Sequence, residues 1–427
     1  MLRLRNEPAF VRWAVAEGLS MVGSAVSMVV LPLIVYEATG SAAQTGLLFA
    51  LRVVPYLLLG AIAAPLADRG NRRLLIIGGN VAEGLLIATI PIAEAFDALT
   101  MTQVYAVGLL SATAFVFSDA AVFGAVPALV GRERLAAANG FLGSMSSTAE
   151  IVGPTLGGVL AAVVGPTNAI WVVAFSLLVA ALVQTTIRSS FRDRSVAIAP
   201  AQPSVAEQVR RALSVVRRQR TMLALVLVGF GNSFAVGTIL GLLVPYAVEQ
   251  LDLAGADGRI GVLYGAGGVG SLLAGVLLSR LFRIERVKWL IPGLLACSSL
   301  LIDGLVASTS FVSALVLMTA FSWSIATTIS VGITYRRLTA PDDLRSSVDF
   351  LGRMIAWGGQ PFGAAIGGLI AVVTAVHVAY PVAALVMAAS AIAASVLLRP
   401  WTALVEPFSK AESLRSEQAT EGTPPQP

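Results

Sequence analysis

The sequence predicts an all-α polytopic membrane protein with twelve transmembrane helices arranged as two pseudo-symmetric six-helix bundles. Of its 427 residues, 56% are hydrophobic and 12% are charged, and the mean hydropathy is +0.83. Soluble domains carry about 25% charged residues. Apolar runs of about 20 residues, the length that crosses a hydrocarbon core, recur along the whole chain. One water-soluble domain cannot use so many of them.

Apolar runs that are interrupted by charged or turn residues define the individual helices. The first six are expected near 10–35, 45–66, 74–95, 101–124, 138–163 and 167–187. The second six are expected near 221–247, 260–281, 288–307, 310–334, 346–372 and 376–398. The first run exceeds the roughly 7–15-residue core of a signal peptide and no small-residue cleavage site follows it, so we expect it to remain as a helix.

The basic residues predict the orientation. With a cytoplasmic N-terminus, 26 of the 29 Lys and Arg residues fall in inner segments and Arg259 lies outside, while Arg52 and Arg353 lie within helices. The positive-inside rule then predicts a multi-pass protein of the inner (plasma) membrane with both termini in the cytoplasm. The formal net charge of +5 is explained by this topology and by anionic lipid, without nucleic acid.

A polar, basic segment over 188–220 separates an N-terminal bundle over 1–187 from a C-terminal bundle over 221–399. Within it, apolar and basic residues over 205–222 follow helical spacing, which predicts an amphipathic helix on the inner membrane surface. The tail over 400–427 is polar and is expected to be disordered and cytoplasmic.

The two halves repeat each other weakly. The run Gly153-Pro154-Thr155-Leu156-Gly157-Gly158 matches Gln360-Pro361-Phe362-Gly363-Ala364-Ala365 with an offset of 207 residues. Parallel six-helix repeats place a substrate site near the midplane between the halves, where rocking opens it alternately to either side. The architecture therefore favours transport.

Two motifs resemble those of the major facilitator superfamily. The turn Ala64-Pro65-Leu66-Ala67-Asp68-Arg69-Gly70-Asn71-Arg72-Arg73 resembles its loop motif, Gly-x-Leu-Ala-Asp-Arg-x-Gly-Arg-Arg. The run Gly153-Pro154-x-x-Gly157-Gly158 resembles the fifth-helix motif of its antiporter members. Arg52-x-x-Pro55 and Pro361-Phe362-Gly363 resemble the branch that contains enterobactin-type siderophore exporters and macrolide efflux pumps. The resemblance covers essentially the whole chain and implies the major facilitator fold.

The resemblance implies that the loop motif is a gate. Asp68 can accept hydrogen bonds from the free N–H groups of a helix N-terminus, which the resemblance identifies as the start of the eleventh helix, near 345–348. With Arg69 beside it, Arg72 would bridge Asp68 to an acid of the fourth helix, for which Asp119 is the candidate. This latch would hold the outward-facing state. The alternative is a solvated turn whose charges only enforce topology.

The fifth-helix motif has a mechanical interpretation. Pro154 removes a helix hydrogen bond, and Gly153, Gly157 and Gly158 allow another helix to approach closely, so a kinked, sliding interface is expected. The alternative is a glycine-rich packing seam that has no role in setting the direction of transport.

Ionisable residues inside the spans indicate function, because an unpaired charge there costs at least about 2.5–3.5 kcal/mol. A carboxyl group that is shielded from water can bind and release a proton near neutral pH. The candidates for proton coupling are, in order, Glu150, Glu17 and Glu83. The alternative is an ion pair with Arg52 or Arg353 that only orders the helices. Drug/proton antiporters of the superfamily often carry an arginine in the fourth helix, and residues 108–115 contain none.

Aromatic and amide side chains on the helices expected to line the cavity suit a bulky amphipathic guest. The candidates are Arg52, Phe115, Asn232, Phe234, Tyr264, Phe321, Trp323, Arg353, Trp357 and Gln360. For each aromatic residue the alternative is packing alone. The arginines would suit an anionic siderophore and the glutamates a cationic drug, so the charge of the guest stays open.

Several patterns argue against an enzyme. The run Gly265-Ala266-Gly267-Gly268-Val269-Gly270 fits a dinucleotide-binding pattern, but no strand precedes it, so a packing seam is expected. Cys297 and His377 each stand alone, which argues against a disulfide or a zinc cluster. The absence of a Gly-Lys-Ser/Thr phosphate loop excludes direct ATP hydrolysis as the energy source. We expect no catalytic residues, no cofactor and no metal.

Three functions remain open. The first is secondary active export of a lipophilic or amphipathic small molecule in exchange for protons. The second is import or facilitated passage of a polar solute, which would call for more polar residues on the seventh helix than its mainly Leu, Val and Gly content provides. The third is a membrane receptor or scaffold, which would call for a larger soluble domain. The expected partners are small molecules, protons and lipids, and a monomer is expected.

The topology can be tested with single cysteines introduced into a Cys297→Ser background. A membrane-impermeant thiol reagent added to whole cells should label a cysteine at Asp97 and should not label one at Ser195, because the basic segments stay inside. The opposite labelling pattern would overturn the orientation.

Overall fold

The computed structural model describes residues 8–187, 207, 210, 214, 220–281, 286–339 and 345–398, without the side chains of 335–356, Asp68, Arg69 and a few others. The predicted surface helix of the linker lies almost wholly outside these residues, and the tail over 400–427 lies outside them entirely. All the secondary structure of the described part is helical.

The N-terminal half consists of six long helices. They are α1 (Pro8–Thr39), α2 (Ala42–Arg69), α3 (Arg72–Ala95), α4 (Met101–Val130), α5 (Leu135–Val164) and α6 (Pro166–Thr185). Side chains start several of them: Ser41, Asn71 and Thr100 each accept a hydrogen bond from the backbone N–H three residues later, at 3.3–3.5 Å. These N-caps satisfy donors that the first helical turn leaves free.

The C-terminal half repeats this arrangement with one helix interrupted. Its helices are α8 (Arg220–Gly241), α9 (Leu243–Glu249), α10 (Gly258–Leu281), α11 (Val287–Ala307), α12 (Phe311–Thr339), α13 (Arg345–Val373) and α14 (Val376–Leu397). Eleven helices of the described part are long and apolar enough to cross a membrane, and Trp357–Val373 of α13 forms a shorter apolar segment. With α13 as the remaining span, the all-α fold with about twelve membrane helices is confirmed.

The predicted span 221–247 is a single segment in the sequence but two helices in the structure. The interruption falls at Leu242, whose backbone has φ −110° and ψ 10°. Pro245 has no N–H, so the carbonyl of Gly241 loses the donor that a continuous helix would supply. Helical bonds resume directly, with the Tyr246 N–H donating to the Leu242 carbonyl at 2.9 Å.

The N-terminal half has two apolar clusters, and the apolar core of the C-terminal half extends into the N-terminal half near one face of the membrane. We call the face that holds the start of α1 and the turn between α2 and α3 the arginine-rich face, and the other the opposite face. The core of the C-terminal half also includes Val29, Leu33, Ala42 and Ala161 of α1, α2 and α5. These four residues lie toward the opposite face, where the halves are therefore packed together.

Glycines bring the backbones of α5 and α10 into contact near the opposite face. A Cβ atom on Gly158 would lie 2.7 Å from backbone atoms of Gly258 and Gly261. A Cβ atom on Gly368 of α13 would likewise lie 3.0 Å from the Cα atom of Ala43 in α2. Both pairs join the two halves, so the opposite face is closed by backbone contacts that leave no room for side chains.

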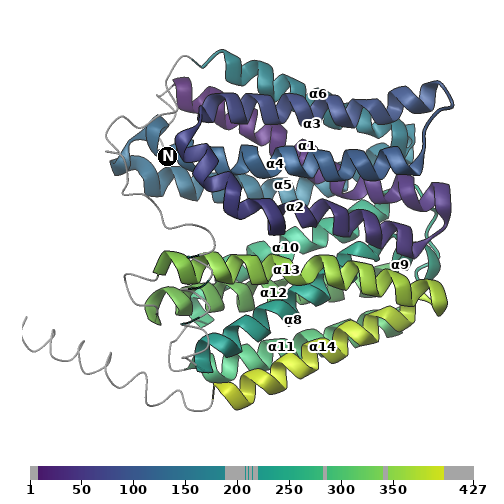
Figure 1. Cartoon of the computed structure of the whole chain (residues 1–427). Helices are drawn as coiled ribbons and strands as arrows, with labels where there is room; N and C mark the ends of the chain where they lie inside the picture. Colours follow the sequence, from purple (N-terminus) through teal and green to yellow (C-terminus); the bar gives the residue numbers. More distant parts are fainter. Residues whose placement is uncertain are drawn as a thin grey trace, which may run out of the picture.

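The halves separate toward the arginine-rich face. Gly275 follows Gly268 by seven residues, which places both on the same side of α10. Gly268 packs against Glu150 of α5, whereas a Cβ atom on Gly275 or on Gly143 of α5 would have nothing within 4 Å. Figure 1 shows α2 and α13 farthest apart at the end where the N-terminus lies. Among the described residues, the halves thus pack together at the opposite face and lie apart at the arginine-rich face.

Gly158→Leu should force this closed seam apart, because its side chain would overlap backbone that cannot rotate away. Spin labels at Phe96 and Thr309, in turns of the opposite face on the two halves, should therefore report a longer distance in double electron–electron resonance. Gly143→Leu is the matched control on the same helix, and it should leave that distance unchanged. An unchanged distance in Gly158→Leu would show that the seam does not hold the halves together.

Candidate functional site

A stripe of polar residues on α1 forms one wall of a buried network in the N-terminal half. Glu17, Ser20, Ser24 and Ser27 follow each other at spacings of three or four, which puts them on one face of the helix. The Ser20 hydroxyl donates to Asn80 Oδ1 at 2.9 Å. The Asn80 amide in turn donates to Gln184 Oε1 at 3.0 Å. The network thus connects α1 with α3 and α6.

Arg52 joins this network from α2. Its guanidinium donates to the Ser27 carbonyl at 3.1 Å and to Ser27 Oγ at 2.8 Å. Its stem passes over Gly108 of α4, where an added Cβ atom would lie 3.5 Å from Arg52 Cγ. The fourth helix contributes no arginine over 108–115, and the glycine in that stretch makes space for a cation from the second helix.

Glu83 is the most enclosed carboxyl group of the network. It lies on α3, one turn after Asn80, and is 4% exposed. The Ser24 hydroxyl and the positive charge of Arg52 are its polar neighbours. Because the Arg52 hydrogen bonds go to Ser27, the guanidinium is not committed to the carboxylate. The predicted alternative of a tight ion pair between Glu83 and Arg52 is therefore not what the structure contains.

The other two candidate acids differ in their surroundings. Glu17 is 9% exposed and has the negative charge of Asp119 as its neighbour. Glu150 is exposed at the seam between α5 and α10, where its carboxylate accepts a hydrogen bond from Ser146 at 3.3 Å. Its side chain is thus less enclosed in this conformation than those of Glu17 and Glu83, and its role in proton coupling stays a prediction.

The arginines of the loop motif contact carbonyl groups near the ends of helices. Arg72 donates to the carbonyl of Gly124 in α4 at 2.8 Å. Arg73 donates to the carbonyl of Thr185, the last residue of α6, at 2.6 Å. Thr185 lies at the C-terminus of α6, where free carbonyls make a cation favourable, whereas Gly124 lies inside α4. The turn thus joins α3 to α4, the helix to which the latch interpretation directs Arg72, and also to α6, which neither interpretation anticipated.

The latch itself remains a prediction. The side chains of Asp68 and Arg69, and those at the start of α13, lie outside the described part of the structure. Asp119 lies on α4, where its side chain is exposed, and its bridge to Arg72 likewise remains a prediction.

The fifth-helix motif packs α5 against two partners at once. Gly153 faces the Ala25 side chain of α1, and a Cβ atom on Gly157 would lie 3.0 Å from the Val26 carbonyl oxygen. Gly158 faces α10 of the other half. At all three glycines the neighbouring helices approach closely. Sliding along it stays a prediction.

Of the predicted aromatic candidates, Phe115 and Trp357 lie together at the boundary between the halves. Tyr56 of α2, which was not among the predicted candidates, is their partner. Its ring stacks on that of Trp357 in α13, with ring centroids 5.1 Å apart and ring planes 11° apart. The Phe115 ring of α4 lies 5.9 Å from the Tyr56 ring. Trp357 remains 42% exposed. Tyr56 directly follows the Arg52-x-x-Pro55 motif, which was the available signal for it.

Other predicted cavity residues are packed away. Phe234, Tyr264 and Phe321 are 7%, 5% and 3% exposed, and the Tyr264 hydroxyl donates to the Leu240 carbonyl at 3.1 Å. Helix packing covers all three in this conformation, and their contact with a guest stays a prediction. Trp323 is half-buried and its Nε1–H has no partner. The Arg353 side chain lies outside the described residues.

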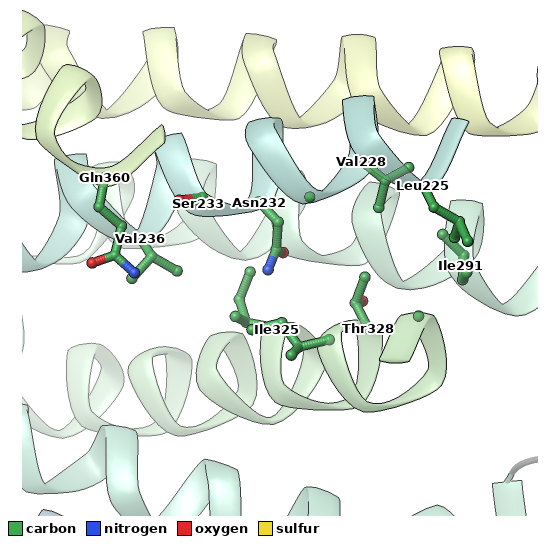
Figure 2. A pocket seen from close by; sticks show the side chains of 12 residues that line it. Leu225, Val228, Asn232, Ser233, Val236, Ile291, Ile325, Thr328 and Gln360 are labelled. Atoms are coloured by element: carbon green, nitrogen blue, oxygen red, sulfur yellow. The ribbon is translucent and has the colours of Figure 1, made fainter. Parts of the chain in front are cut away.

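Asn232 and Gln360 line a pocket inside the C-terminal half. It has a volume of about 140 Å³ and is bounded by α8, α11, α12 and α13. Figure 2 shows the Asn232 side chain projecting from α8 toward Ile325 and Thr328 of α12, with Gln360 at one end. Ser233 and Thr328 also line the pocket. The sequence did not single them out, because hydroxyl groups are common in membrane helices. The described residues hold no group of three or more potential metal ligands.

On the opposite face, Arg259 is paired with an acid. Its guanidinium lies 2.6 Å from Asp257 Oδ2, and these hydrogen bonds hold the pKa of Asp257 below its ordinary value. The one basic residue that the sequence places outside is thereby neutralised at neutral pH. An exposed pair of this kind contributes little to stability, because water screens the attraction.

The two six-helix halves, closed on one membrane face and open on the other around a polar interior, define a membrane transporter rather than an enzyme. The chain belongs to the Major Facilitator Superfamily, whose model matches residues 13–348.

Its relatives include efflux proteins. The chain is 23% identical over 302 residues to macrolide efflux protein A of Streptococcus pyogenes. The matched region covers 70% of this chain and 73% of that protein. The chain is 25% identical over 383 residues to the enterobactin exporter EntS of Shigella boydii, covering 87% and 88% of the two chains. The resemblance to this branch is confirmed.

Solved structures show the same fold. A bacterial homologue of the iron transporter ferroportin in an inward-facing state matches with a TM-score of 0.70 and 17% identity, covering 94% of this chain and 99% of that one. The nucleoside transporter NupG matches with a TM-score of 0.73 and 10% identity, covering 92% and 99%. At these identities the likeness establishes the fold alone.

Proposed function

We propose that the chain exports an amphipathic small molecule across the inner membrane in exchange for protons. The observation that carries this proposal is the enclosed Glu83 carboxyl group beside a guanidinium that bonds elsewhere. The macrolide, enterobactin and multidrug efflux relatives support the direction of transport. The guest and the coupling ion are the parts of the proposal that experiment must decide.

The orientation supports loading from inside the cell. By the positive-inside rule the arginine-rich face is the cytoplasmic face, and the predicted topology puts both termini and the 188–220 segment on that side. Since the halves separate toward this face, the guest enters from the cytoplasm or the inner leaflet. Rocking of the two halves would then close this entrance and open the seam between α5 and α10 to the outside.

The boundary between the halves suits a lipophilic guest. Tyr56 and Trp357 present stacked rings at the depth where α2 and α13 begin to part, and Trp357 keeps an exposed surface. A stacked aromatic pair contributes about 0.5–1.5 kcal/mol beyond its buried area. An aromatic or macrocyclic guest can replace that contact as the halves rock apart, whereas a small polar solute cannot.

Coupling is assigned to Glu83 and Arg52. A charge in the centre of a membrane protein is costly unless it is neutralised. Glu83 can be neutralised by a proton, or by Arg52 if the guanidinium leaves Ser27. The two states differ by one proton and by the position of one side chain that also touches α1 and α4. Rocking of the halves can therefore be linked to protonation. Glu17, with Asp119 beside it, is the competing site.

The assignment is tested with purified protein in liposomes that carry an imposed pH gradient and a radiolabelled macrolide. Glu83→Gln should reduce gradient-driven accumulation to the level of protein-free liposomes, because glutamine keeps the shape but cannot titrate. Binding of the macrolide should be preserved. Glu150→Gln tests a competing candidate on an acid that is exposed in this conformation, and it should keep most of the accumulation; loss in this variant with full accumulation by Glu83→Gln would move the proton site to α5.

Three outcomes separate the possibilities. Full accumulation by Glu83→Gln together with loss in Glu17→Gln would move the proton site to α1. Full accumulation by all three variants would contradict proton coupling through these acids. Accumulation by the parent protein that ignores the gradient would contradict proton exchange altogether.

A further inference from the structure

The pocket inside the C-terminal half contains polar atoms that no protein group satisfies. Asn232 is 3% exposed and its Oδ1 atom has no hydrogen-bond partner. Ser233, the next residue, is also 3% exposed, and its Oγ atom has no partner either. An unsatisfied buried polar group costs about 1–3 kcal/mol, and such groups call for an explanation. Both residues line the pocket. Their oxygen atoms are enclosed by protein, so an occupant reaches the Asn232 oxygen only when the amide turns about its Cβ–Cγ bond and directs that oxygen into the pocket.

The lining of the pocket defines the chemistry of its occupant. None of the twelve lining side chains is ionisable. Leu225, Ile291 and Ile325 form apolar walls. The Thr328 hydroxyl donates to the Ser324 carbonyl at 2.9 Å, so its lone pairs remain available. The occupant should therefore be uncharged, apolar in its body, and able to donate a hydrogen bond to the Asn232 oxygen.

The size of the pocket limits how much of a guest it can hold. Its volume of about 140 Å³ exceeds several times the roughly 30 Å³ that a water molecule occupies in the liquid. Sites for whole drug-sized ligands measure about 300–1,000 Å³. The pocket therefore accommodates one part of an amphipathic molecule.

The pocket is connected to the boundary between the halves through α13. Gln360 forms one end of it and follows Trp357 by three residues, so both side chains lie on the same side of α13. Trp357 stacks on Tyr56 of the other half. A guest whose ring system lies against this aromatic pair can thus extend a substituent toward Asn232.

We propose that this pocket is a specificity subsite that binds a neutral, hydrogen-bond-donating substituent, such as a hydroxyl or primary amide group, of the transported guest. That the bound molecule is transported rests on the proposed function, whereas the binding itself does not. Asn232 Oδ1 is the acceptor that distinguishes a hydroxylated guest from one that lacks the donor. Compounds that carry a charge on this substituent are excluded, because no lining group can pair with it.

The test uses three small probes and the full chain in lipid nanodiscs, with binding measured by saturation-transfer NMR against empty nanodiscs. The probes are 2-naphthylmethanol, 2-methylnaphthalene and 2-naphthoate. The parent should prefer the alcohol over the methyl compound by about three- to tenfold, the contribution of one hydrogen bond. It should bind 2-naphthoate no better than empty nanodiscs do.

Asn232→Leu should remove the preference for the alcohol, because leucine matches the shape but offers no acceptor. Its melting temperature without a probe should equal or exceed that of the parent, since an unsatisfied amide is lost. Asn168→Leu, at an exposed position of α6, is the control and should keep the preference.

An unchanged preference in Asn232→Leu, or no preference in the parent, would overturn the proposal. A lower melting temperature with the preference retained would show that Asn232 is structural, which would also overturn it. No gradient and no transport enter this experiment. A protein that shows the preference and fails to accumulate a macrolide would contradict the proposed function and leave the subsite standing.

Discussion

The backbone contact between α5 and α10 is the constraint on which the rest of the structure depends. Gly158 and Gly261 carry no side chains where the two halves meet, so the helices approach as closely as backbone atoms allow. Dispersion contacts weaken sharply with a gap of less than an ångström. The seam therefore favours two states, closed or open, over a graded series. Its closure leaves the arginine-rich face as the open one.

The described residues divide the polar groups unequally between the halves. Glu17, Glu83 and Arg52 lie in the interior of the N-terminal half, whereas the pocket of the C-terminal half is lined only by neutral side chains. Burying a charge costs far more than burying an amide. This division allows protonation in one half to bias the rocking motion while the other half recognises uncharged features of the guest.

The sequence predicted the helices well because hydropathy and turn residues act locally. The break at Leu242 was not predicted from Pro245, since Pro154 and Pro361 lie inside continuous helices and tertiary packing decides which proline interrupts a helix. The glycines of α5 were predicted to allow close approach, but which helix each one faces depends on tertiary packing. The stack of Tyr56 on Trp357 joins residues about 300 positions apart, so no local pattern reveals it. The exposure of Glu150 depends on the conformation. The Asn232 oxygen is unsatisfied because no neighbouring group donates a hydrogen bond to it, which only the packed structure reveals.

A reversible disulfide across the seam tests the central claim most directly. A Cβ atom on Gly258 would lie 3.6 Å from Val159 Cα, so cysteines at Val159 and Gly258 in a Cys297→Ser background are close enough to be joined. Oxidation should stop gradient-driven macrolide accumulation in liposomes, and reduction should restore it, because the cross-linked halves cannot open to the outside. Full accumulation by the cross-linked protein would contradict alternating access through this seam.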